Sequence, residues 1–176
     1  MAQARSWRDA DGRAAMRDFL GQPPPRRAAI RDLMKELLSE NPFARRCAAD
    51  LARRVSEREP GILRAYAGVL IDLVAQIPLD QWQTRGYLML AAAQNAWTRA
   101  ERMSLATLAR SMIDDERIAL RAIGIEAFAT VAAAEPELRD EAMFLLEGYR
   151  RDGVPALRSR ARRMLLVLSR TVAAGG

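Results

Sequence analysis

Arginine is the residue type in this sequence with the clearest capacity for binding chemistry. The chain has 28 basic and 22 acidic residues, a net charge of +6, and every basic residue except Lys35 is an arginine. A guanidinium forms paired hydrogen bonds with phosphates and carboxylates. Near the C-terminus we therefore predict a candidate binding surface for phosphates or an acidic partner helix, formed by Arg158, Arg160, Arg162 and Arg163. The alternative interpretation of this cluster is a solvated cap on the end of the protein.

Residues suited to catalysis or metal binding are sparse. The sequence contains no histidine, which excludes acid/base chemistry by imidazole and metal coordination by histidine. The carboxylate pairs Asp114/Asp115 and Glu135/Glu137 precede predicted helices, where they would complement the helix dipole. The single cysteine, Cys47, lies on an apolar helix face and is expected in the core. We therefore predict a protein that is not an enzyme and that uses no cofactor and no metal.

The elements that position these residues are predicted to be helices. Half of the residues are hydrophobic, which suffices for a sizeable core, and the apolar residues recur at helical spacing. Asn41 before Pro42 predicts one helix start, and Thr98 with Glu101 predicts another. We expect eight helices in four hairpins, because short connections make neighbouring helices antiparallel.

Two further predictions concern individual helices. Pro60 is expected to open the third helix, since proline is tolerated in the first turn of a helix. The segment from Ile118 to Ala134 is apolar nearly all round. A helix of this kind must be covered on several faces, so we expect it in the interior.

One pattern recurs along the chain at a near-constant interval. The second helix of each predicted hairpin carries one of four arginines, which are 39, 36 and 37 residues apart: Arg46, Arg85, Arg121 and Arg158. Six positions after each arginine stand Ala52, Ala91, Ala127 and Met164. A polar or acidic turn residue precedes each arginine: Asn41, Asp80, Asp115 and Asp152. A period in the high thirties is typical of a helical solenoid.

The segments DDERIALRAIGIEAF and NPFARRCAADLARRV resemble HEAT or HEAT-like repeats, and the resemblance covers roughly residues 26–170. It implies an all-α, right-handed α–α superhelix of about four HEAT-like hairpins. In that family the turn aspartate and the helix arginine commonly bridge adjacent repeats. The resemblance therefore implies a structural ladder of Asp80, Asp115 and Asp152 with Arg85, Arg121 and Arg158. The repeat with Asn41 and Arg46 departs from the pattern, because asparagine carries no charge.

The sequence divides into three predicted parts. Residues 1–25 are polar and end in a proline run, which predicts an N-terminal arm or short capping helix started by Ser6 and Asp9. Residues 26–170 form the repeat domain, and residues 171–176 are expected to be a flexible tail. The longest apolar run is far shorter than the roughly 20 residues that cross a bilayer. We therefore expect a cytoplasmic protein without a membrane partner.

The predicted function is recognition rather than chemistry. Stacked hairpins form extended curved surfaces, so we expect a scaffold or adaptor that binds another macromolecule, in the first place a protein. The alternative is nucleic-acid binding through the arginine-rich faces, similar to the HEAT-like DNA glycosylases, although none of that family's catalytic residues can be matched here. The open end of a short stack would also favour a homodimer.

Overall fold

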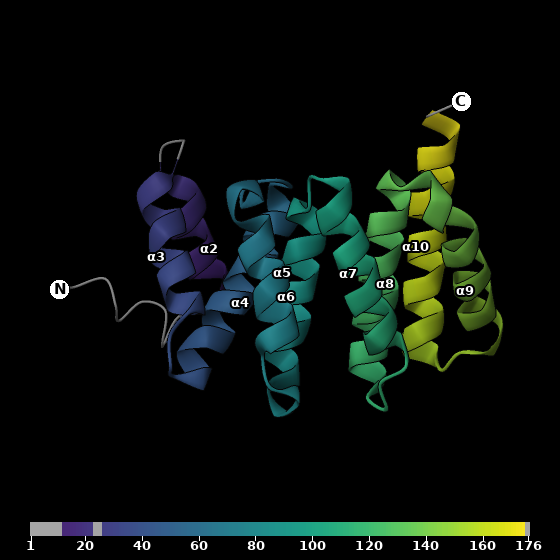
Figure 1. The fold of residues 1–176 in the computed structure, drawn as a ribbon, viewed down its shortest axis with the longest axis horizontal. Coiled ribbons are helices and arrows are strands. Elements are labelled where there is room, and N and C mark those ends of the chain that lie inside the picture. Colours follow the sequence, from purple (N-terminus) through teal and green to yellow (C-terminus); the bar gives the residue numbers. More distant parts are fainter. Residues whose placement is uncertain (1–11, 23–25, 175–176) are drawn as a thin grey trace. The chain divides into compact units, whose positions relative to one another are not determined.

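The computed structural model describes residues 12–22 and 26–174. It divides the chain into two compact units, Met1–Asn95 and Ala96–Gly176, which are described separately below. Within the described ranges every regular element is a helix and none is a strand, so the prediction of an all-α protein is confirmed (Figure 1). None of these helices combines the length and the low charge that crossing a bilayer requires.

The first unit contains five α-helices and two short 3₁₀ segments in its described part. In chain order they are α2 (Gly12–Gly21), α3 (Arg27–Leu37), α4 (Pro42–Arg58), η2 (Arg64–Tyr66), α5 (Ala67–Gln76), η3 (Leu79–Gln81) and α6 (Trp82–Asn95). Helix α4 packs against α2, α3 and α6, and α5 packs against α6. The two arginine-bearing helices of this unit, α4 and α6, are thus direct neighbours.

The second unit contains four α-helices and one 3₁₀ segment within the described residues. They are α7 (Arg99–Ile113), α8 (Ile118–Ala134), η4 (Pro136–Leu138), α9 (Arg139–Asp152) and α10 (Pro155–Ala174). Helix α8 packs against α7, α9 and α10, and Figure 1 shows it between α7 and α10. The expectation that the apolar segment from Ile118 to Ala134 is interior is confirmed for this unit.

The predicted helix starts are partly confirmed. The Asn41 side chain accepts hydrogen bonds from the backbone N–H groups at the start of α4. Thr98 forms a capping box with Glu101 at the start of α7. The predicted start at Pro60 is wrong, because the next α-helix after this proline, α5, begins only at Ala67. Gly61, in the turn between α4 and α5, adopts a φ of 84° and donates its N–H to the Gln94 carbonyl. That left-handed conformation interrupts the helix.

The positions six residues after each arginine lie in the core of the two units. Ala52, Ala91 and Ala127 are fully buried, and Met164 is 4% exposed. Small side chains at these positions let helix axes approach closely, as in the contacts of α4 with α6 and of α8 with α10. The sequence pattern therefore marks buried positions on the second helices.

The ends of the chain differ in what the structure describes. The caps predicted at Ser6 and Asp9 lie outside the described residues, whereas Gly12–Gly21 forms α2 and buries Phe19. At the other end α10 continues to Ala174. Most of the segment expected to be a tail, residues 171–176, is therefore part of the last helix.

A buried polar cluster joins α4 and α6 in the first unit. The Asn95 side chain donates to Ser56 Oγ (2.8 Å) and to the Ala91 carbonyl (2.7 Å), and it accepts the Leu63 N–H (2.7 Å). Asn95 is 2% exposed and Ser56 is fully buried. All these groups are satisfied by protein atoms, so the cluster fixes the turn after α4 against the end of α6.

We expect Asn95→Leu to destabilise the protein by about 2 kcal/mol, because it leaves the buried Leu63 N–H without an acceptor. Ser56→Ala removes a single hydrogen bond and should cost about 1 kcal/mol. Urea denaturation followed by circular dichroism measures both. An Asn95→Leu variant as stable as the wild type would show that the cluster contributes nothing.

A close backbone approach joins α7 and α8 in the second unit. A Cβ atom on Gly124 would lie 2.8 Å from the Ala109 carbonyl oxygen and 2.9 Å from the Ile113 amide nitrogen. Both atoms belong to the α7 backbone and cannot rotate away. Only glycine allows α7 and α8 to pack at this distance.

Gly124→Ala is expected to lower stability by about 1–3 kcal/mol, as overpacking does, because α7 must shift away from α8. Gly148→Ala is the matched control, since a Cβ there meets nothing within 4 Å. This control should stabilise α9 by about 0.5–1 kcal/mol. The melting temperatures of Gly124→Ala and Gly148→Ala, measured by thermal unfolding, test this difference. Equal melting temperatures would show that Gly124 is not required for the close packing of α7 and α8.

Candidate binding surface

The four C-terminal arginines of the predicted binding surface lie on α10 but do not act as one cluster. Arg160 and Arg163 both pair with Glu126 on α8, with 2.5 Å between Arg163 Nη2 and Glu126 Oε1. The Glu126 side chain is only 17% exposed, so this carboxylate is held between the two helices. Arg158 and Arg162 are exposed. Half of the predicted surface thus stabilises the packing of α10 on α8.

The predicted aspartate–arginine ladder takes a different form within each unit. Asp115 pairs with Arg117 (3.4 Å), and Asp152 pairs with Arg151 (2.8 Å). Each aspartate therefore binds an arginine close to it in sequence. Among the described residues no carboxylate pairs with Arg121, whose guanidinium lies 5.7 Å from the centre of the Tyr149 ring on α9. This cation–π contact, and not an ion pair with Asp115, links that arginine to the next hairpin.

The remaining ladder residues also have other partners. Arg85 Nε donates to the Val74 carbonyl near the end of α5 (3.1 Å), as a C-terminal cap. Arg46 donates to Gln83 Oε1 (3.0 Å) and lies over the Phe43 ring. Asp80 is exposed and lines a depression of about 240 Å³ with Arg46 in the first unit. The aspartate ladder is therefore not formed within this unit.

Other ion pairs connect the helices of the second unit. Arg102 pairs with the buried Glu135 at the end of α8 (2.5 Å), and Arg99 with Glu137 (2.6 Å). The partners in these pairs are more than 30 residues apart in the sequence, and sequence analysis did not find them. Many arginines and carboxylates alternate along the chain, so spacing alone does not identify which of them meet.

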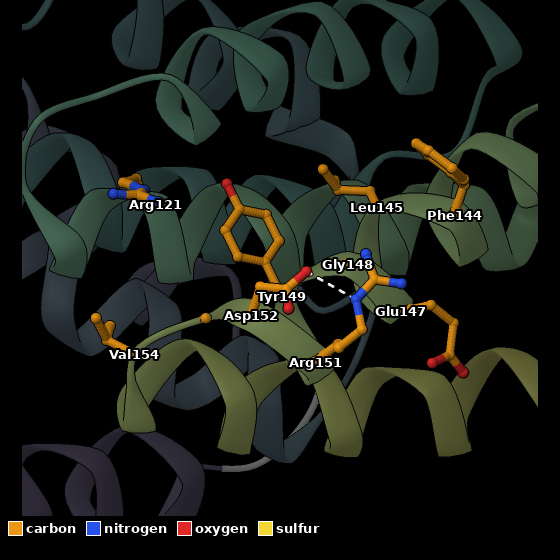
Figure 2. Close-up of a pocket in the computed structure, with 10 residues that line it drawn as sticks. Arg121, Phe144, Leu145, Glu147, Gly148, Tyr149, Arg151, Asp152 and Val154 are labelled. Carbon is orange, nitrogen blue, oxygen red and sulfur yellow. Dashed lines mark hydrogen bonds and ion pairs between the residues drawn. The ribbon is translucent and has the colours of Figure 1, made fainter.

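One depression in the second unit lies between α8, α9 and the turn that leads to α10. It has a volume of about 510 Å³, and its walls include Phe144, Leu145, Tyr149, Val154 and Arg121. Figure 2 shows that Phe144, Leu145 and Tyr149 point to the same side of α9, with Tyr149 toward Arg121. Phe144 is 85% exposed. An exposed phenylalanine beside an open apolar depression is typical of a binding surface.

A second depression of about 250 Å³ continues along the same helix toward its start. It is lined by Phe144 and Leu145 together with Ile113, Asp114 and the Arg110–Glu141 pair. The two depressions share two side chains, so they adjoin along α9, and together we call them the α9 groove. Arg110 binds both carboxylate oxygens of Glu141 (2.7 and 2.6 Å) at one edge.

The α9 groove exists because α9 carries more apolar side chains than its packing buries. Ala142 and Leu146 face α8 and α10 and are buried. Leu145 and Tyr149 are half-buried. Phe144 lies outside the row of buried side chains that Ala142 and Leu146 form on α9. The sequence did not single out Phe144. The signal available was an extra aromatic residue outside the helical stripe.

No group of three or more cysteine, aspartate or glutamate side chains within the described ranges is placed to hold a metal ion. Cys47 is half-buried, and burial raises the pKa of its thiol above the ordinary value. The thiolate, which is the nucleophilic form, is therefore disfavoured.

Comparison with known proteins adds no identification. No protein-family model, curated protein or solved structure matches the chain significantly. The α9 groove is therefore the feature of the molecule that supports a function.

The Arg110–Glu141 pair makes stability depend on pH. The hydrogen-bonded guanidinium of Arg110 holds the pKa of Glu141 below its ordinary value of 4.5. A carboxylate with a lowered pKa in the folded state stabilises the protein above its unfolded-state pKa and loses this contribution as the pH falls through the folded-state value.

We expect Glu141→Gln to lower the free energy of unfolding by up to about 1 kcal/mol at pH 7, since the pair is half-exposed. The difference from the wild type should shrink as the pH falls below about 4 and should vanish in strong acid. Urea denaturation at pH 7, 5, 4 and 3 measures this. Glu116→Gln, an exposed glutamate with no ion pair among the described residues, is the control, and a constant difference for Glu141→Gln at all pH values would contradict the argument.

Proposed function

We propose that this protein is a non-catalytic, HEAT-like helical-repeat scaffold that binds another protein through the α9 groove. The observation that carries the proposal is the exposed Phe144 between two apolar depressions on one helix face. Isolated exposed apolar residues are ordinary, but a contiguous apolar groove is typical of an interaction site. A protein partner would bury Phe144, Leu145 and Val154 on binding.

Hydrogen bonds between equivalent repeat positions support the repeat part of the proposal. Ser56 and Asn95 each lie ten residues after their repeat arginine, and their side chains bond to each other. Glu126 and Arg163 each lie five residues after theirs, and they form an ion pair. Contacts between equivalent residues of successive repeats are expected when hairpins stack in register. A right-handed solenoid of about four hairpins is the arrangement we propose for residues 26–170.

Nucleic-acid binding is the competing proposal, and one observation favours it. Arg158 and Arg162 are exposed on α10 and form no ion pair with any residue in the described part of the chain. The neighbouring Arg160 and Arg163 are neutralised by Glu126, however. Within the predicted surface, two free guanidinium groups provide little of the charge that sequence-independent binding to a phosphate backbone requires. A protein partner is therefore the better-supported proposal.

Phe144→Asp tests the proposed function. Tagged full-length protein, purified from cells that make it, should recover a defined partner, and this variant should reduce the recovery at least about tenfold, because it places a charge in the apolar contact. Leu166→Asp is the matched control, since Leu166 is 59% exposed on α10 and outside the groove. Both variants should keep the wild-type melting temperature, because each side chain is exposed.

A photo-crosslinking amino acid at position 144 provides the second readout. It should form a protein adduct that the same group at position 166 does not form. Recovery that is unchanged by Phe144→Asp, or an adduct with nucleic acid and none with protein, would overturn the proposal.

A further inference from the structure

The α9 groove is elongated along its helix. Its lining residues on α9 run from Glu141 to Asp152, a distance of about 16 Å at the rise of an α-helix. Five residues of an extended chain, or three turns of a helix, have about this length. The groove therefore has the dimensions of a peptide segment rather than those of a compact small molecule.

Most of the charges around the groove are already paired. Arg110 binds Glu141, Arg150 binds Glu147, and Arg151 binds Asp152. These pairs leave little net charge along the edges of the groove. The selectivity of the groove for a charged partner must come from the charged side chains that have no ion-pair partner among the described residues.

Two charged side chains lie at opposite ends of the groove without an ion-pair partner among the described residues. Arg121 lies at the end that Tyr149 and Val154 line, where its guanidinium lies 5.7 Å from the centre of the Tyr149 ring. Asp114 lies at the other end, beside Ile113 and Phe144. Arg121 is half-buried, and a partly desolvated guanidinium gains from a carboxylate more than an exposed one does.

We infer that the α9 groove binds a short peptide segment of the partner with one apolar side chain at its centre and a charged residue on each side. A carboxylate of the segment pairs with Arg121, and a basic side chain lies near Asp114. The apolar side chain packs on Phe144 and Leu145. This inference rests on the proposed function and adds the chemistry and the orientation of the partner.

The charge distribution argues against a polyanion in the same groove. Four carboxylates line its two depressions, those of Asp114, Glu141, Glu147 and Asp152. Because Glu141, Glu147 and Asp152 are each paired with an arginine, the groove presents little net positive charge to a nucleic-acid backbone. A peptide with one acidic and one basic residue instead has an opposite charge near each of its own, Arg121 at one end of the groove and Asp114 at the other.

The test uses a phage-displayed library of random 12-residue peptides, selected on the full-length protein. Selected peptides should share an apolar residue with an acidic residue on one side and a basic residue on the other. In a synthetic peptide, replacing the acidic residue by its amide should weaken binding about tenfold, measured by fluorescence anisotropy. Exchanging the acidic and basic residues should weaken it further, since both ends then face a like charge.

A double-mutant cycle assigns the effect to Arg121. Arg121→Gln should weaken binding of the acidic peptide about tenfold. It should leave binding of the amide peptide almost unchanged. Arg162→Gln, an exposed arginine on α10 outside the groove, should change neither. The peptide substitutions leave the protein untouched, so they remain decisive even if Arg121→Gln lowers the melting temperature.

The outcomes separate the two proposals. Peptides that lose binding with Phe144→Asp but tolerate loss of their acidic residue would overturn the charge assignment and leave the α9 groove as the binding site. Selected peptides that bind Phe144→Asp as well as the wild type, or a library that yields no binder, would count against the groove as a peptide site and so against both proposals. Enrichment for acidic residues alone, without an apolar residue, would overturn the inference in favour of simple charge attraction.

Discussion

Close packing of helices through small side chains is the constraint on which both units depend. Gly124 lets the α8 backbone lie against α7, and fully buried alanines stand six residues after the repeat arginine on α4, α6 and α8. At this distance polar side chains of adjacent second helices come within hydrogen-bonding reach, as Ser56 and Asn95 do. The polar contacts between hairpins are therefore a consequence of backbone packing, and they fix its register.

Sequence analysis predicted the features that depend on neighbours within one turn of helix. The Asn41 cap and the Thr98–Glu101 capping box belong to this group. It failed at Pro60, where a proline suited to a helix start precedes a glycine with positive φ. A glycine permits that conformation without requiring it, so only the hydrogen bond from Gly61 to Gln94, more than 30 residues away, decides the outcome.

The candidate site was less predictable, for a physical reason. Two arginines follow Asp115 within six residues, Arg117 and Arg121, and the sequence does not show which of them it binds. The structure pairs it with Arg117 and leaves Arg121 against Tyr149. Phe144 lies outside the buried stripe of α9, and its exposure depends on how far α8 and α10 cover that helix. Neither fact follows from periodicity.

The use of arginine within the molecule links charge to function. An excess of basic residues suggests attraction to phosphate, yet many of these arginines bind carboxylates of the same chain: Arg26, Arg53, Arg54, Arg99, Arg102, Arg110, Arg160 and Arg163. Arginines paired in this way stabilise helix contacts and contribute little to the field that a distant ligand meets. Recognition then depends on the guanidinium groups left over, and Arg121 differs from the exposed Arg158 and Arg162 because it adjoins an apolar groove. A single half-buried cation beside apolar side chains favours a carboxylate on an apolar segment over a run of phosphates.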